Sequence, residues 1–399
     1  MVVTEVSSQS WFGRIGESIK GVLFGLLLFV VAFPVLFWNE GRAVKRAKTL
    51  AEGQGAVQRN VPAEKVDPAM DGKLVHMQGE ATSSETLTDD LFTSVSADNV
   101  IKLERVVEMY QWQERQESKT RKKLGGGTET VKTYTYNKTW STSPIDSSKF
   151  HPDGASEYGR GNPPMPYQSG SQAAGVVSLG AFRLNPGLVS RINAWTPLAV
   201  DQAALDALPA EARAKLKLSK NGFYQGANPA SPGIGDLSVT FQVVKPTRVS
   251  IIAEQTGETF QPYQAKTVAG SLELLEIGDK SADEMFALEV SRNNTLTWIL
   301  RGVGFVVMAL GIGLVFRPIT VFADVIPLFG NILGAGIGIF AFVTAAMFSL
   351  ITIAIAWVFY RPVLGICLIV VGVGIVVGAM MIFRNRKNTE NLESVVELE

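Results

Sequence analysis

Four apolar stretches stand out along this chain, one near its start and three in its final quarter. The first carries no charge, and its length is near the minimum that crosses a hydrocarbon core of about 30 Å. The second contains only Arg301, close enough to its start for the guanidinium to reach lipid headgroups. The last two are separated by Arg361 and Pro362 alone and must form a tight helical hairpin. We expect transmembrane helices over 21–38, 298–316, 332–360 and 363–383.

Shorter segments flank these stretches. Residues 317–331 are apolar but contain Asp324 and Pro327 and are too short to span, so we expect an interfacial or re-entrant piece there. No small-residue cleavage site follows the first stretch at 37–40, which predicts an uncleaved anchor. The remaining segments are the N-terminal residues 1–20, a large loop over 39–297 and a tail over 384–399.

The basic residues beside these stretches give opposed indications of topology. Arg384, Arg386 and Lys387 follow the fourth stretch and place the tail in the cytosol by the positive-inside rule. The basic run over 42–48 follows the first stretch and would place the large loop in the cytosol instead. Because long translocated loops respond less to charge, and because this run can belong to the folded domain, we expect cytosolic termini and an extracytosolic loop.

The large loop changes to the two-residue period typical of β-strands. Residues 106–116 and 130–142 flank a basic, glycine-rich turn at 122–127, which predicts a β-hairpin. Further strands are expected over 236–245, 248–255 and 271–277, a helical stretch over 199–218 and irregular chain over 143–172. The run from Ser281 to Glu284 resembles a capping box that starts a helix toward the second apolar stretch. The fold class is therefore an α-helical integral membrane protein with a large inserted β-rich α+β domain, built as a sheet or a barrel.

Composition narrows the classes of function. Lysine plus arginine and aspartate plus glutamate each number 37, and this neutral balance argues against bulk nucleic-acid binding. The single cysteine, Cys367, lies in an apolar stretch, so the loop has no disulfide and depends on its own core. Two histidines and one cysteine exclude Cys/His zinc sites. No Gly-x-Ser-x-Gly elbow or Walker loop occurs, and we expect no cofactor and no metal ion.

An ordered set of short motifs resembles the LUMA family, transmembrane protein 43. The set comprises residues 37–43, 74–76, 107–112, 134–137 with Trp140, 235–237, 298–301 and 359–362. No single motif is diagnostic, but together they extend over nearly the whole chain. The chain departs from the family pattern in its acidic end at 390–399 and in the triple glycine at 125–127.

The resemblance implies a multi-span protein with a large lumenal domain in the endoplasmic reticulum and inner nuclear membrane of animals. It implies an organiser of membrane protein complexes that self-associates and contacts nuclear-envelope proteins. In a bacterium only the architecture and the membrane-organising role would transfer, with the protein in the cytoplasmic membrane and the domain in the periplasm.

Polar residues near the predicted span ends form the candidate functional cluster, because ionisable groups at such depth are functional candidates. The cluster is Asn39, Glu40, Arg42, Arg301, Arg317, Asp324, Tyr360 and Arg361. In the structural alternative the arginines reach lipid phosphates, while Glu40 and Arg42 pair locally. Glycines four residues apart predict close helix packing. They are Gly21 and Gly25, Gly334 and Gly338, and Gly374 and Gly378.

Inside the loop, His76 is a lone histidine in a predicted strand and favours a satisfied structural residue. The aromatic residues of the hairpin favour core packing or a protein-binding face over stacking on nucleic acid. We therefore expect a non-enzymatic membrane scaffold that self-associates through its extracytosolic domain, with membrane lipids and other membrane proteins as partners and no nucleic acid. The alternative is an intramembrane enzyme or lipid-binding protein that uses the polar cluster at the membrane interface.

Overall fold

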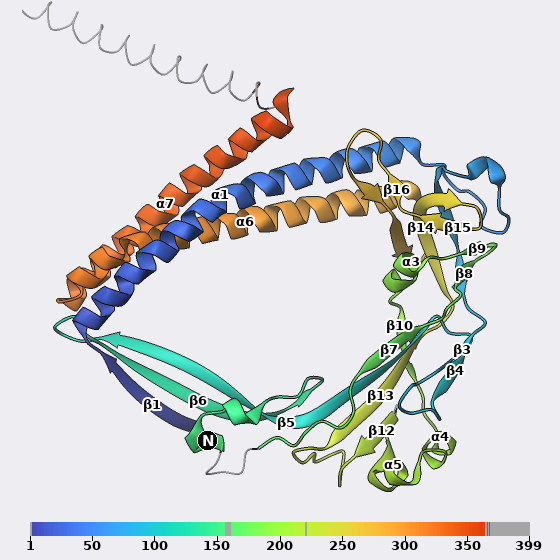
Figure 1. Ribbon diagram of the computed structural model, residues 1–399, viewed down its shortest axis with the longest axis horizontal. Helices are drawn as coiled ribbons and strands as arrows, with labels where there is room; N and C mark the ends of the chain where they lie inside the picture. The colour runs from blue at the N-terminus through green and yellow to red at the C-terminus, as the bar shows by residue number, and fades with distance from the viewer. Residues whose placement is uncertain (1, 156–160, 220–221, 364, 366, 368–399) are drawn as a thin grey trace, which may run out of the picture. The chain divides into compact units, whose positions relative to one another are not determined.

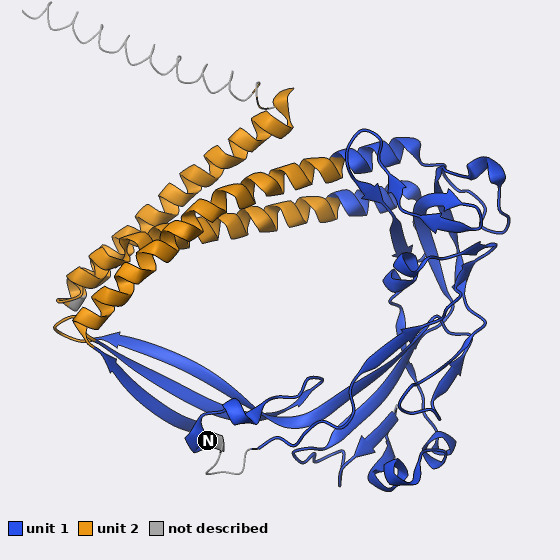
Figure 2. Ribbon diagram, in the orientation of Figure 1, with its two compact units in different colours: residues 1–9, 48–122, 128–290 blue, residues 10–47, 123–127, 291–399 orange. Residues whose placement is uncertain are grey.

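The computed structural model describes residues 2–155, 161–219, 222–363, 365 and 367. The chain divides into two compact units, coloured separately in Figure 2. The sheet unit comprises residues 1–9, 48–122 and 128–290. The helical unit comprises residues 10–47, 123–127 and 291–399. Each unit is described by itself below.

Three long helices dominate the helical unit: α1 (Trp11–Ala56), α6 (Ala282–Ala323) and α7 (Pro327–Tyr360) (Figure 1). Each contains an apolar stretch long enough to cross a membrane, so the helices expected over the first three spans are confirmed as candidate membrane helices. Most of the fourth predicted span, 363–383, lies outside the described residues, as does the tail over 384–399.

Residues 317–331 do not form a separate segment. Helix α6 continues through Pro318 to Ala323, a turn follows, and Pro327 occupies the first turn of α7. Proline suits that position because the first N–H groups of a helix have no acceptor inside the helix. Where the sequence suggested a re-entrant piece, the structure has a tight turn between two long helices.

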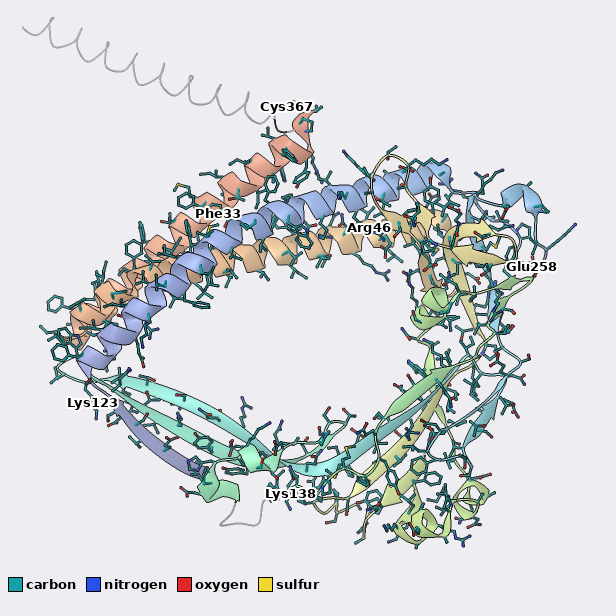
Figure 3. The ribbon with its side chains drawn as sticks, in the orientation of Figure 1. Phe33, Arg46, Lys123, Lys138, Glu258 and Cys367 are labelled. Carbon is teal, nitrogen blue, oxygen red and sulfur yellow. The ribbon has the colours of Figure 1, made fainter. Side chains whose placement is uncertain are left out.

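The long helices pack through a small apolar core. Its buried members are Ala32, Leu36, Met308, Ile312, Ala341 and Ala345. Phe33 of α1, labelled in Figure 3, and Phe29 lie against Phe348 of α7 with ring centroids 6.0 and 5.6 Å away. Helices α1 and α6 approach closely at Gly25 and Gly311, where a Cβ added to Gly25 would lie 2.7 Å from the Gly311 carbonyl oxygen.

Two main sheets form the sheet unit. The larger sheet has the order β1–β6–β5–β13–β12–β11, with β7 also paired to β5 and β10 to β13. Its strands are β1 (Val2–Gln9), β5 (Lys102–Lys122), β6 (Thr128–Ser141), β7 (Gly170–Ala173), β10 (Trp195–Leu198), β11 (Leu216–Ser219), β12 (Gly222–Gln225) and β13 (Leu237–Val244). The β-rich domain expected from the sequence is thus confirmed.

The smaller sheet has the order β15–β9–β8–β2–β14–β18, and β15 also pairs with β14; we assign no closed barrel. Its strands are β2 (Leu74–Thr82), β8 (Ser178–Leu179), β9 (Phe182–Arg183), β14 (Thr247–Thr256), β15 (Thr259–Gln261) and β18 (Leu274–Ile277). Two further pairs are β3 (Thr86–Thr88) with β4 (Ser96–Asp98) and β16 (Tyr263–Gln264) with β17 (Ser271–Leu272). The short helices are α2 (Pro152–Ala155), α3 (Pro186–Arg191), α4 (Gln202–Asp206) and α5 (Ala210–Lys215).

The predicted hairpin is β5 with β6, which turn at Gly125 and Gly126, both with positive φ as such a turn requires. Strands β13 and β14 occupy the stretches expected over 236–245 and 248–255, but they belong to different sheets. The helical stretch over 199–218 is divided at Pro209 into α4 and α5, and its last residues begin β11.

The capping box is confirmed at the start of α6. The Ser281 backbone N–H donates to the Glu284 carboxylate at 2.8 Å, and the Glu284 N–H donates to Ser281 Oγ at 3.3 Å. The ends of α1 and α6 that belong to the sheet unit are buried in its core. Leu50 of α1 and Met285 and Phe286 of α6 lie there in one apolar cluster with strand residues of the smaller sheet.

Strand β1 attaches the N-terminal segment to the sheet unit. It pairs antiparallel with β6, from Val2 opposite Thr135 to Gln9 opposite Thr128. Two strands paired in one ladder must lie on the same side of a membrane, because neighbouring strands are only about 5 Å apart and a hydrocarbon core is about 30 Å thick. The expectation that 1–20 and 39–297 face opposite compartments stays a prediction, which a cross-link across the ladder can test. The hydrophobic pattern gives no sign of this long-range pairing.

Cysteine cross-linking in membranes tests the ladder. In a Cys367→Ser background, Ser7→Cys with Thr130→Cys should form an intramolecular disulfide, because these residues are opposite partners and facing Cα atoms in a ladder lie within disulfide reach. Ser7→Cys with Thr139→Cys is the matched control, since Thr139 faces β5 far from Ser7 in register. A cross-link that forms in detergent but never in membranes would mean that α1 crosses the bilayer and separates the strands.

Candidate functional site

A buried carboxylate links the three long helices. Glu40 follows the apolar stretch of α1 and is 1% exposed. Its carboxylate accepts hydrogen bonds from Arg301 Nε at 2.7 Å and from Arg301 Nη2 at 2.8 Å, a two-point contact of the strong kind. A third comes from Trp357 Nε1 at 2.8 Å. One side chain each from α1, α6 and α7 therefore meets at this point.

Arg42, two residues further along α1, donates only to neutral acceptors among the described residues. Its Nη1 donates to Asn293 Oδ1 at 3.0 Å, and its Nη2 donates to Thr297 Oγ1 at 3.0 Å and to Asn39 Oδ1 at 3.3 Å. Asn39 is fully buried and donates to the Thr297 carbonyl at 3.1 Å. The Arg42 Nε is buried and has no hydrogen-bond partner. A partly buried cation among neutral dipoles favours an anion nearby.

The polar side chains around Glu40 and Arg42 form a polar layer, and tryptophans surround it. The Arg301 guanidinium carbon lies 4.7 Å from the Trp298 ring centroid and 5.7 Å from that of Trp357, within cation–π range. Trp298 is 68% exposed and Trp38 is 59% exposed. Exposed tryptophans at the boundary between apolar and charged helix segments are typical of a membrane–water interface.

A cavity of about 160 Å³ opens beside the Glu40–Arg301 pair. It is lined by Glu40, Ala43, Asn293, Asn294, Thr297, Trp298, Arg301, Trp357 and Arg361. Within the described residues, no carboxylate pairs with the Arg361 side chain. Arg42, Arg301 and Arg361 thus outnumber the carboxylate of Glu40, and the layer carries a net positive charge.

The structure gathers most of the predicted cluster but not all of it. Asn39, Glu40, Arg42, Arg301, Tyr360 and Arg361 lie in or beside this layer. The Tyr360 ring stands where a Cβ on Gly41 would be, 2.6 Å from its Cζ. Arg317 is exposed elsewhere on α6. Asp324 lies near the opposite end of the apolar helices, buried and paired with Arg14 at 2.5 Å.

Sequence reasoning missed Asn293, Thr297 and Trp357. Asn293 and Thr297 precede Arg301 at intervals of four, which places all three on one face of α6 and offered a usable signal. Trp357 offered none, because it stands within an apolar stretch far away in sequence.

Only one of the predicted glycine pairs contains a close contact in the described structure. Gly25 meets the α6 backbone, whereas a Cβ on Gly21 would touch only Leu314 Cδ2 at 4.0 Å. A Cβ on Gly334 would touch Thr320 Cγ2 at 3.9 Å, and one on Gly338 would meet nothing within 4 Å. Gly374 and Gly378 lie outside the described residues.

His76 is satisfied in the sheet unit. It is fully buried, its Nε2 lies 2.9 Å from the Lys280 carbonyl oxygen, and desolvation lowers its pKa, which favours the neutral ring. Across the described residues, no group of three or more His, Cys, Asp or Glu side chains is arranged to hold a metal ion.

Comparison with known proteins identifies the family. A family model described as transmembrane protein 43 matches residues 109–362. Transmembrane protein 43 of Rattus norvegicus is 34% identical over 372 residues, covering 90% of this chain and 89% of the relative. The chain belongs to the transmembrane protein 43 family.

Other members of the family also align with this chain over most of their length. The Homo sapiens protein is 33% identical over 405 residues, covering 98% of this chain and 96% of its own. The Drosophila melanogaster homolog is 28% identical over 369 residues, covering 88% and 91%. No solved structure matches the chain. As a member of this family with three long apolar helices, the protein is an integral membrane protein.

Proposed function

We propose that this protein is a non-enzymatic membrane scaffold that organises membrane proteins by self-association of a β-rich domain held outside the cytosol. The observation that carries the proposal is that α1 and α6 continue without a linker from their apolar stretches into the core of that domain. Leu50 of α1 and Phe286 of α6 are 1% exposed there. A domain built directly on membrane helices suits a structural role better than one tethered by a flexible linker.

A hydrogen-bonded carboxylate supports the same attachment. The Glu52 carboxylate of α1 accepts hydrogen bonds from Tyr263 Oη at 3.1 Å, from the Lys266 N–H at 2.6 Å and from the Thr267 N–H at 2.9 Å. The Thr267 hydroxyl and these backbone donors lower the pKa of Glu52 to about 2. Glu52 therefore stays ionised and holds the loop over 263–267 at every physiological pH.

Strand β1 supports self-association. It is the last strand of its sheet, so one edge of its backbone has no described partner strand. Val2 and Val6 are 56% and 59% exposed, and the strand carries no lysine or proline, the residues that commonly protect such edges. Two copies pairing edge to edge would form a closed, two-fold symmetric contact. The compartment we propose is an endomembrane in a eukaryote or the cytoplasmic membrane in a bacterium.

Mass measurement of the full-length protein in nanodiscs tests the proposal. Wild type should give a defined oligomer, and Val6→Lys should shift it to monomer, because a lysine on the open edge opposes strand addition. Leu91→Lys, which replaces another exposed apolar residue of the sheet unit, is the matched control and should keep the oligomer. A monomeric wild type, or an oligomer unaffected by Val6→Lys, would contradict self-association through this edge.

A further inference from the structure

We propose that the cavity beside Glu40 and Arg301 binds the phosphate group of an anionic phospholipid. The inference goes beyond a scaffold role, because it assigns a specific ligand to the polar layer of the helical unit. It rests on charge, on available donors and on the position of the cavity at the end of the apolar helices.

The charge of the layer favours an anion. Glu40 already makes two hydrogen bonds with Arg301 and one with Trp357, so its single negative charge is engaged. Arg42 has neutral partners, and Arg361 lines the cavity without a described carboxylate partner. An anion entering the cavity would compensate cations that the described residues leave unbalanced.

The donors that face the cavity fit a phosphate. Arg301 uses Nε and Nη2 for Glu40, and its Nη1 makes no hydrogen bond within the described structure. Arg361 supplies a second guanidinium, and Asn294 is an exposed amide on the same wall. One guanidinium group can donate hydrogen bonds to two oxygens of the same phosphate. A planar indole ring such as that of Trp298 stacks on the guanidinium and holds it in place.

The surroundings favour a lipid over free phosphate as the source. The cavity begins where the apolar stretches of α1 and α6 end and where α7 reaches Arg361. Exposed tryptophans at this level place it at headgroup depth. At about 160 Å³ it can hold a headgroup phosphate but not acyl chains, which would lie along the exposed apolar faces of the helices.

Native mass spectrometry of the full-length protein tests this site. The probes are phosphatidic acid, phosphatidylcholine with the same acyl chains, and inorganic phosphate. Arg361→Gln is the test variant, because it removes a cavity cation that no described ion pair needs for folding. Arg317→Gln is the matched control, since Arg317 is an exposed arginine of α6 outside the cavity. Circular dichroism and gel filtration check that both variants fold.

Wild type should retain one phosphatidic acid with a preference of about tenfold or more over phosphatidylcholine. Arg361→Gln should lose about tenfold in affinity for phosphatidic acid, and Arg317→Gln should change it by less than about twofold. Equal losses in both variants, or equal binding of both lipids, would overturn the site. Inorganic phosphate binding as tightly as phosphatidic acid, with the same dependence on Arg361, would support the phosphate chemistry and overturn its assignment to a lipid.

Discussion

Replacing Glu40 with alanine should lower the free energy of unfolding by about 3–5 kcal/mol, which is the typical loss when one partner of a buried ion pair is removed. The magnitude follows from burial, because Glu40 is 1% exposed and the Arg301 side chain is 15% exposed. The substitution also leaves the Trp357 indole N–H without its acceptor. Urea unfolding of the detergent-solubilised protein measures the change.

Two variants separate this explanation from a general loss of packing. Glu40→Ala combined with Arg301→Met removes both charges, so much of the lost stability should return. Glu17→Ala removes an exposed carboxylate from the same helix and should change stability by less than about 0.5 kcal/mol. If the double variant lost as much free energy of unfolding as the sum of the losses of Glu40→Ala and Arg301→Met, the ion pair would not be the source of the effect.

Gly25→Ala should destabilise the protein by about 1–3 kcal/mol, because an extra methyl group there forces α1 and α6 apart. The added Cβ would lie 2.7 Å from the Gly311 carbonyl oxygen and 2.8 Å from Leu314 Cβ. The nearest of these atoms is backbone, which cannot rotate away as a side-chain tip can. Alanine favours a helix over glycine by about 1 kcal/mol, and the clash must exceed that gain. Thermal unfolding in nanodiscs measures the result.

Gly21→Ala is the matched control, one turn earlier on the same helix. Its Cβ would touch only Leu314 Cδ2 at 4.0 Å, so helix propensity should dominate and stability should stay equal or rise slightly. Equal destabilisation by both substitutions would contradict a specific contact between Gly25 and Gly311.

The elements that the sequence predicted are those whose signal is local. Long apolar runs indicated helices α1, α6 and α7, and the glycine-rich turn at 122–127 indicated the hairpin. The capping box at Ser281 depends on residues three apart, and it too was recovered. In each case the physical cause acts within a few residues, which is the range that a hydrophobic pattern can report.

The features that the sequence did not predict depend on contacts across long separations. Trp357 joins Glu40 from 317 residues away, and nothing in its apolar surroundings marks it as a hydrogen-bond donor to a carboxylate. Similarly, Gly311 meets Gly25 without a four-residue glycine partner of its own. Strands β13 and β14 follow each other closely in the sequence, and nothing local in either strand reveals that they enter different sheets.

The pairing of β1 with β6 has a consequence for the order of events during synthesis. Roughly 120 residues separate the paired strands, so at 5–20 residues per second β1 waits about 6–24 s for its partner to be made. The apolar stretch of α1 leaves the ribosome early in that interval. The compartment of the first nine residues is therefore decided while the ladder does not yet exist, and only chains that retain β1 beside the emerging domain can complete the sheet.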